Sequence, residues 1–160
     1  MARNGLRGLC LVCVAAMGLL LAGCGVSFVV ATPKGFVELK DQEPHFDYRA
    51  VNADGVVIAV REIEHEPKGD TDFWIQAIRS QMREKAGYAL LEEKKVTTRS
   101  GLKGTQLRFG HDEENESMLY CITVFVTDKY IYVIEFGGTK EQMTNQRAHM
   151  DWVVDSFRKK

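Results

Sequence analysis

The spacing of apolar residues changes along the chain, and each change predicts a different kind of element. Apolar and β-branched residues dominate the segments 46–51 and 56–63, and Asn52-Ala53-Asp54-Gly55 lies between them. Such segments are typical of strands, and a glycine at the turn position that needs a positive φ is typical of a hairpin. The two segments therefore predict a pair of antiparallel strands.

After this hairpin the spacing becomes helical. Apolar side chains from Phe73 to Met82 recur at intervals of three and four residues, and Asp70 or Thr71 precedes them as a capping residue. Gly87 follows in the position where a glycine commonly ends a helix. The sequence predicts a first helix between these two boundaries.

Two further strand pairs follow the first helix. The segments 88–99 and 104–110 form one predicted pair, and the segments 119–127 and 130–136 form the other. The last of these segments is apolar on both faces. Because such a strand must be covered on both sides, we expect helices in front of and behind the sheet.

A second helix is predicted near the C-terminus. Thr139-Lys140-Glu141-Gln142 fits a capping box, in which the first and fourth side chains accept from each other's backbone N–H groups. An apolar stripe follows at helical spacing. It consists of Met143, Met150, Val153, Val154 and Phe157.

The N-terminus has the pattern of a secretory signal peptide, because Arg3 and Arg7 are the only charged residues before Lys34 and an apolar run covers 9–21. An uncleaved membrane-spanning helix is the competing interpretation, since about 20 apolar residues suffice to cross a bilayer. Glycines and a serine make the second half of the segment 8–30 a poor helix, which favours the signal peptide.

Leu21-Ala22-Gly23-Cys24 ends the apolar run and resembles the lipobox of bacterial lipoproteins. The resemblance implies cleavage after Gly23, a diacylglycerol on the sulfur of Cys24, and an extracytoplasmic protein anchored to the membrane by lipid. In Gram-negative lipoproteins an aspartate after the cysteine commonly retains the protein in the inner membrane, so Gly25 implies the outer membrane, facing the periplasm, in such a host. We expect a signal peptide over 1–23, a lipidated N-terminus and short tether over 24–32, and a folded domain over 33–160.

Cleavage would leave Cys24 and Cys121 in the mature chain, because Cys10 and Cys13 lie in the signal peptide. With Cys24 acylated no intramolecular disulfide can form, and a buried, inert thiol is the favoured interpretation of Cys121. The full chain carries 21 basic and 22 acidic residues, and cleavage removes basic residues alone. Such an acidic domain argues against nucleic acid as a partner and against charge-driven binding to anionic lipids.

Candidate metal ligands occur in the acidic stretch 111–116. Asp112, Glu113, Glu114 and Glu116 supply the carboxylate oxygens that hard cations prefer. The stretch lacks the residue order of an EF-hand loop, so a solvated loop between two strands is the favoured interpretation.

Other clusters give weaker signals. Glu62, Glu64 and Glu66 alternate around His65 at a strand end, which favours a solvated face. Gly137-Gly138-Thr139-Lys140 opens a helix after a strand and could hold an anion, but it lacks the Walker pattern. The chain contains no H-E-x-x-H, G-x-S-x-G or zinc-type Cys/His spacing. We therefore expect no enzymatic activity, no catalytic residue and no cofactor.

Four stretches spread over the predicted domain carry a family resemblance: GVVIAVREIEHEPKGDTDFW, GYALLEEKKVTTRSGLKGTQLRFG, YIYVIEFGGTKEQM and VVDSFRK. They resemble the PsbP-like superfamily, especially its bacterial envelope branch related to DcrB. The resemblance implies an α+β fold, an α/β/α sandwich with a mostly antiparallel sheet flanked by helices. It also implies a non-enzymatic accessory or binding role, because the family brings no catalytic set with it.

Two hypotheses follow from these observations. The first is a membrane-anchored lipoprotein that acts as a non-enzymatic accessory or protein-binding module of the cell envelope, with an unidentified envelope protein as its partner. The alternative is a lipoprotein that binds a cation or a small ligand, through the acidic stretch 111–116 or a cleft beside the sheet.

Overall fold

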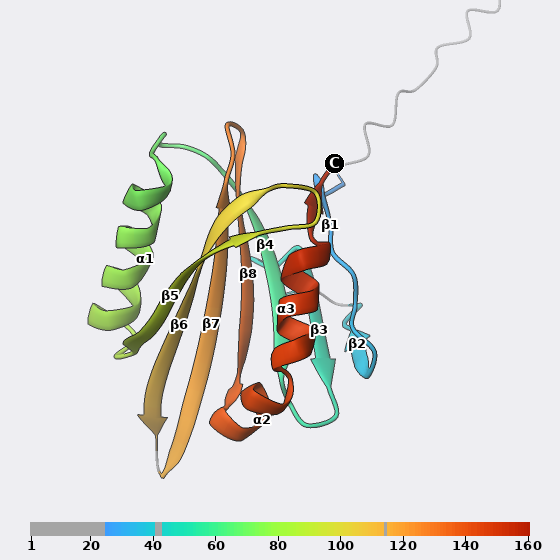
Figure 1. Ribbon diagram of the computed structural model, residues 1–160, viewed down its shortest axis with the longest axis vertical. Helices are drawn as coiled ribbons and strands as arrows, with labels where there is room; N and C mark the ends of the chain where they lie inside the picture. The colour runs from blue at the N-terminus through green and yellow to red at the C-terminus, as the bar shows by residue number, and fades with distance from the viewer. Residues whose placement is uncertain (1–24, 41–42, 114) are drawn as a thin grey trace, which may run out of the picture.

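The computed structural model describes residues 25–40, 43–113 and 115–160. Within this part of the chain, seven antiparallel strands form one sheet in the order β2-β3-β4-β8-β7-β6-β5 (Figure 1). They are β2 (Phe36–Glu38), β3 (Tyr48–Asn52), β4 (Val57–Glu64), β5 (Ala89–Thr97), β6 (Lys103–Glu113), β7 (Glu116–Val126) and β8 (Tyr130–Thr139). The remaining elements are β1 (Phe28–Val29), which pairs with β9 (Arg158–Lys159), and the helices α1 (Thr71–Glu84), α2 (Lys140–Asn145) and α3 (Arg147–Ser156). The prediction of an α+β fold with an antiparallel sheet is confirmed.

The predicted hairpins and the first helix are present. Strands β3 and β4 pair as expected, and Gly55 in their turn has a φ of 93°. Asp70 caps α1, since its side chain accepts from Phe73 N at 2.8 Å. Strand β8 lies between β4 and β7 in the middle of the sheet, which explains why both of its faces are apolar.

Helices pack on both sides of the sheet, and each side has its own apolar core (Figure 1). On one side, Met143 of α2 and Val153 of α3 pack with the buried side chains of β4 and β8. On the other side, Ile75 of α1 packs in a smaller core that includes Leu107 of β6 and Val124 of β7. Among the helices that the structure describes, α1 alone covers the second side.

The C-terminal helical segment is broken in two, which differs from the single helix predicted. Gln146, between α2 and α3, has φ −96° and ψ 7°, outside the helical region. The break lets Met143 of α2 and Val153 of α3 both face the twisted sheet. The capping box is confirmed, because Thr139 N donates to Gln142 Oε1 at 2.8 Å and Gln142 N donates to Thr139 Oγ1 at 3.3 Å.

The acidic stretch 111–116 is not the solvated loop predicted, because β6 and β7 continue through it as a hairpin. Asp112 lies opposite Ser117 in the ladder, and the Ser117 hydroxyl donates to its carboxylate at 2.7 Å. Asn115 in the turn has a φ of 79°. The strand ends could not be recognised from apolar spacing, because Asp112, Glu116 and Ser117 are all exposed there.

Residues 26–29 pack into the folded domain. Phe28 is buried, and its ring is stacked on Phe157 at a centroid distance of 5.6 Å. Ser27 donates to Glu62 Oε2 through its backbone N–H group at 2.7 Å and through its hydroxyl at 2.6 Å. Lys160 N donates to Ser27 O at 2.7 Å, so the two ends of the described chain lie side by side (Figure 1).

Candidate functional site

A cleft of about 440 Å³ lies between α1 and the sheet face that this helix covers. Its volume falls within the range of about 300 to 1,000 Å³ that is usual for ligand sites. Apolar side chains from α1, β4, β7 and β8 make up most of its wall: Trp74, Ala77, Ile78, Met82, Ile63, Ile122, Ile131 and Val133. Such a wall suits an apolar ligand or an apolar segment of another protein.

The cleft exists because α1 covers only part of the sheet. Ile75 is the buried residue of this helix, whereas Trp74 and Ile78 on the same helix are only half-buried. On the sheet, Ile63 of β4 is 41% exposed. The face of β4 and β8 beside the helix therefore stays open.

A second hollow of about 460 Å³ adjoins the first, and Tyr88, Tyr120 and Glu135 line both. Together the hollows follow β8 from Ile131 to Gly137, a span of about 20 Å at the usual rise of a strand. We call the two hollows together the β8 groove. Its length fits an extended segment of about six residues.

Gly137 shapes one wall of the β8 groove. A Cβ atom at this position would lie 3.1 Å from Cδ2 of Tyr120. Gly138 is restricted too, since its Cβ would lie 3.0 Å from Gln142 Oε1 and 3.3 Å from Val56 Cγ2. The two glycines thus have packing roles, and the anion site considered for Gly137-Gly138-Thr139-Lys140 has little support, because α2 has only six residues.

An ion pair lies in the middle of the β8 groove. Arg61 Nη2 of β4 donates to Glu135 Oε1 of β8 at 2.5 Å, and the Glu135 side chain is 5% exposed. Arg61 Nε and Glu135 Oε2 are also buried, and neither has a hydrogen-bond partner among the described residues. Burial raises the pKa of the neighbouring Tyr120, and the negative charge of Glu135 raises it further. The Tyr120 hydroxyl is hydrogen-bonded to Glu135 and, like that of any tyrosine, is protonated at neutral pH.

The charges that line the β8 groove occur in pairs. Besides the pair of Arg61 with Glu135, Arg49 Nη1 lies 2.6 Å from Glu43 Oε1. The Phe46 ring lies beside both arginines, with its centroid 5.5 Å from Arg49 Cζ and 5.8 Å from Arg61 Cζ. The groove therefore has charged groups but no net charge to select a charged ligand.

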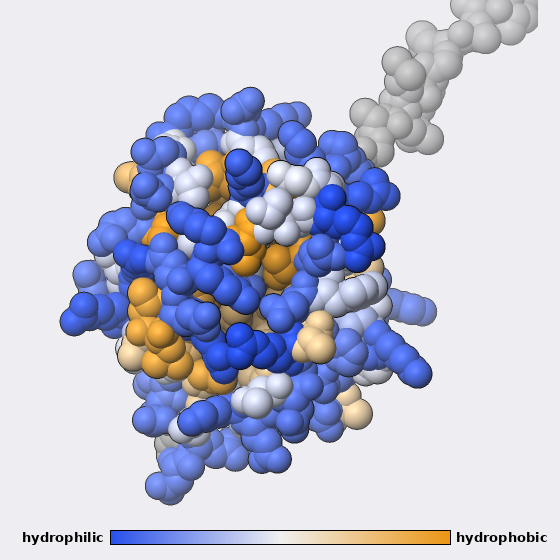
Figure 2. All heavy atoms as spheres, viewed as in Figure 1, coloured by the Kyte–Doolittle hydropathy of each residue, from blue (hydrophilic) through white to orange (hydrophobic). Residues whose placement is uncertain are grey.

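The apolar surface continues beyond the groove toward the edge strand β5. The face of the molecule seen in Figure 2 is largely hydrophilic, and a hydrophobic patch at its lower left lies over the start of β5. Leu90 and Leu91 in this strand are 42% and 58% exposed. A further hollow, which Tyr88 and Leu90 both line, lies next to the groove.

The predicted metal candidates do not gather into a site within the described residues. In this part of the chain, no group of three or more His, Cys, Asp or Glu side chains is placed to hold a metal ion. Asp112 is bonded to Ser117, and Glu116 is exposed. The side chains of Glu113 and Glu114 lie outside the described residues.

His65 is a buried contact rather than part of a solvated cluster, although Glu64 and Glu66 beside it are exposed. His65 Nδ1 lies 2.6 Å from Thr127 O, and Nε2 accepts from Trp74 Nε1 at 3.1 Å. The ring thereby links β4, the β7–β8 turn and α1, and it orients Trp74 at one end of the β8 groove.

The predicted cleavage site Gly23 and lipidation site Cys24 lie outside the described residues. Among the residues that are described, no helix is long and apolar enough to cross a membrane. Cys121 is buried as predicted, and burial raises its pKa to about 12, which keeps the thiol protonated and unreactive at neutral pH.

No sequence pattern above points to Arg61, Tyr120 or Glu135. The signal that could have found them is a carboxylate in the otherwise apolar segment 130–136. A buried carboxylate needs a partner, and Arg61 lies in another strand of the predicted sheet.

No protein-family model matches the chain, and no curated protein sequence matches it. Solved structures do match. LpqN of Mycobacterium tuberculosis, which is involved in cell envelope biogenesis, has a TM-score of 0.62 at 10% identity, over 86% of this chain and 86% of its own. The cyanobacterial PsbP (CyanoP) from Synechocystis has a TM-score of 0.56 at 12% identity, over 84% of this chain and 87% of its own. The fold is PsbP-like.

The PsbP-like fold of this chain is also similar to that of the Ran-binding protein Mog1p from Saccharomyces cerevisiae. The TM-score is 0.59 at 14% identity, over 82% of this chain and 89% of Mog1p. At identities this low the structural matches show a common fold alone, and the expected PsbP-like fold is confirmed.

Proposed function

We propose that the protein is a membrane-anchored lipoprotein of the cell envelope, in which a PsbP-like α/β/α sandwich of the DcrB-related branch binds a protein partner through the β8 groove and carries out no chemistry. The observation that carries the proposal is the open, largely apolar groove beside α1. A long apolar groove left uncovered on a small domain is typical of a surface that another molecule occupies.

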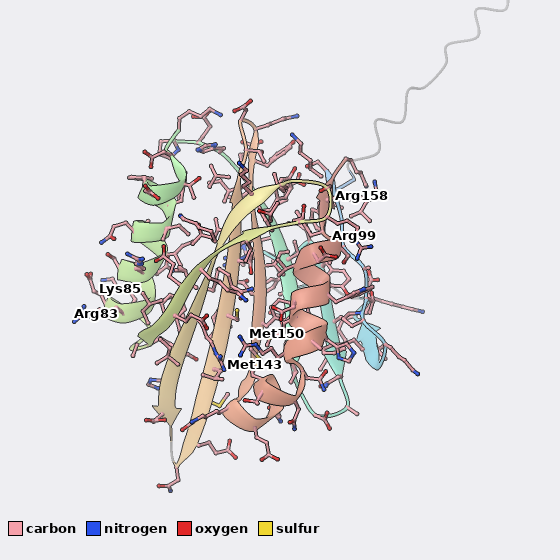
Figure 3. The ribbon with its side chains drawn as sticks, in the orientation of Figure 1. Arg83, Lys85, Arg99, Met143, Met150 and Arg158 are labelled. Carbon is pink, nitrogen blue, oxygen red and sulfur yellow. The ribbon has the colours of Figure 1, made fainter. Side chains whose placement is uncertain are left out.

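The anchor follows from the lipobox and is compatible with the start of the fold. Two or three acyl chains on Cys24 would hold the domain durably, since each buried CH₂ contributes about 0.8 kcal/mol. Residues 26–29 already pack against the C-terminal strand β9, so the folded domain would lie close to the bilayer. Figure 3 shows Arg99 and Arg158 at this end of the molecule. In a Gram-negative host, Gly25 in place of the retaining aspartate permits transport to the outer membrane, where the domain would face the periplasm.

One of the similar structures agrees with the cell envelope and another with a binding role. LpqN is involved in cell envelope biogenesis, and Mog1p binds Ran. The likeness is one of fold, so it supports an accessory module in general and identifies no partner.

A second candidate function uses the same groove for a small ligand. It is favoured by the 440 Å³ volume of the first hollow and by the two buried atoms without partners, Arg61 Nε and Glu135 Oε2. A small ligand with one hydrogen-bonding group in an apolar body would suit these features.

Crosslinking in living cells tests the proposal. The photoreactive residue p-benzoylphenylalanine replaces Gln81, an exposed residue of α1 that lines the groove. The matched control carries it in place of Trp152, which is 41% exposed on α3 across the sheet. We expect Gln81 adducts with one reproducible envelope protein that Trp152 does not give. Identical adducts from both positions, or none from Gln81, would contradict a protein partner in the groove.

A further inference from the structure

The middle of the β8 groove holds one unused donor and one unused acceptor. Arg61 has already bonded Nη2 to Glu135 Oε1, but Arg61 Nε and Glu135 Oε2 lack partners among the described residues. A buried polar atom without a hydrogen bond costs about 1 to 3 kcal/mol. A ligand that supplied an acceptor and a donor side by side would remove both costs.

A peptide group has this combination, because its C=O accepts and its N–H donates. The Arg61 side chain is 36% exposed, so it can turn toward a bound segment from its place beside the Phe46 ring. The Tyr120 hydroxyl is hydrogen-bonded to Glu135 and helps to fix the carboxylate at the same point. One amide of a bound segment can thus be held by Arg61 and Glu135.

The lining also restricts the charge of the ligand. Arg61 is paired with Glu135 and Arg49 with Glu43, so a charged side chain in the groove would find each opposite charge already used. Burial of an unpaired charge is strongly unfavourable. The groove therefore favours a neutral segment.

A fatty acyl chain is the competing occupant, since it is neutral and apolar and can be about 20 Å long. It offers no hydrogen bond along its length, so Arg61 Nε and Glu135 Oε2 would be left buried without partners. The position of the ion pair in the middle of the groove therefore favours a peptide over an acyl chain.

We propose that the β8 groove binds an extended, neutral and apolar peptide segment of about six residues, one amide of which is held by Arg61 and Glu135. This inference rests on the proposed function and names the part of the partner that enters the groove. Binding needs no covalent step and no cofactor.

Tryptophan fluorescence gives a direct test, because the chain has two tryptophans and Trp74 lines the groove. Trp152→Phe on α3 leaves Trp74 as the reporter. The full chain in phosphatidylcholine vesicles is titrated with an acetylated and amidated hexapeptide that alternates leucine with serine. It is also titrated with analogues of this peptide in which each backbone amide in turn is replaced by an ester. Palmitic acid is the third ligand and represents an acyl chain. We expect a saturable change in Trp74 emission with the hexapeptide, and about tenfold weaker binding for one of the esters.

Variants separate recognition from folding. Glu135→Gln should weaken hexapeptide binding by about tenfold. Asp151→Asn, which removes a carboxylate from the Lys94 ion pair on the other side of the sheet, should leave binding unchanged. Should Glu135→Gln fail to fold, Ala77→Phe replaces it, because this exposed α1 residue lines the groove and its enlargement should block the peptide.

Any of three results would overturn the inference. The first is that palmitic acid saturates the Trp74 signal while the hexapeptide does not, and the second is that every ester analogue binds as tightly as the hexapeptide. The third is that the Ala77→Phe variant binds the hexapeptide as tightly as the Asp151→Asn variant does. The proposed function is tested separately by crosslinking from Gln81. A partner captured there while the hexapeptide fails to bind would overturn the peptide inference alone.

Discussion

Arg61 and Glu135 form an ion pair between the neighbouring strands β4 and β8, and the carboxylate is buried in the middle of the sheet face. Burial of such a pair carries a desolvation cost that its attraction often fails to offset, so stability alone is a weak reason for it. Its place in the β8 groove gives a better reason, since both side chains offer atoms to a ligand.

The ion pair makes a prediction about unfolding. Arg61→Met should lower the free energy of unfolding by about 3 kcal/mol, because it leaves the Glu135 carboxylate buried without its partner. Arg61→Met combined with Glu135→Leu should restore most of this loss. Urea denaturation measures both changes. The control is Lys94→Met, which breaks the more exposed Lys94–Asp151 pair. It should change the free energy of unfolding by less than about 1 kcal/mol. Equal losses for Arg61→Met and the control would show that Glu135 is not held by Arg61.

The packing of the N-terminal segment can be tested in the same way. Phe28→Ala should lower the free energy of unfolding by about 3 to 5 kcal/mol, because the Phe28 ring is 3% exposed and packs against Phe157 and Tyr132. Val37→Ala, at a side chain that is 67% exposed, should cost much less. If the two variants unfold alike, residues 26–29 form a free tether and the domain is not held close to the membrane.

The buried thiol predicts a pH dependence. Burial raises the pKa of Cys121 to about 12 from an ordinary value of 9.0, so the folded thiol stays protonated while the unfolded one ionises above pH 9. The contribution of the buried, protonated thiol to the free energy of unfolding is fully present below pH 9. It is lost as the pH rises toward 12. At pH 10 the wild type should lose about 1 kcal/mol more than Cys121→Ala, relative to pH 8. Parallel pH profiles for the two chains, measured by urea denaturation, would contradict this.

The lipobox is tested at Cys24. Cys24→Ser should abolish both the cleavage after Gly23 and the attachment of acyl chains. Mass spectrometry of the protein in the membrane fraction measures both changes. Cys13→Ser, inside the predicted signal peptide, is the matched control and should give the wild-type mature protein. A mature, lipid-bearing Cys24→Ser protein would refute the lipoprotein assignment.

Much of the fold could be predicted because its signals are local. A glycine in the turn before β4, Asp70 ahead of α1 and the capping box of Thr139 each involve neighbours in the chain. The apolar residues on both faces of β8 agree with its place between β4 and β7.

The missed features depend on contacts between distant segments. Residues 26–29 fall within the predicted tether 24–32, because no local pattern records their pairing with β9 at the other end of the domain. The break at Gln146 follows from the twist of the sheet under two helices, which no local pattern records. The β8 groove depends on how far α1 extends over the sheet, so neither its outline nor the meeting of Arg61 with Glu135 could be derived from spacing.

The most direct test of the central claim asks whether the β8 groove is occupied in the cell. Gln81→Cys places a thiol on the groove wall, and Trp152→Cys places one across the sheet, while Cys121 is buried in both. Labelling of each chain by a maleimide is compared between intact cells and the purified full chain in vesicles. We predict that Gln81→Cys reacts more slowly in cells and that Trp152→Cys reacts alike in both. Equal labelling of Gln81→Cys in cells and in vesicles would contradict the account.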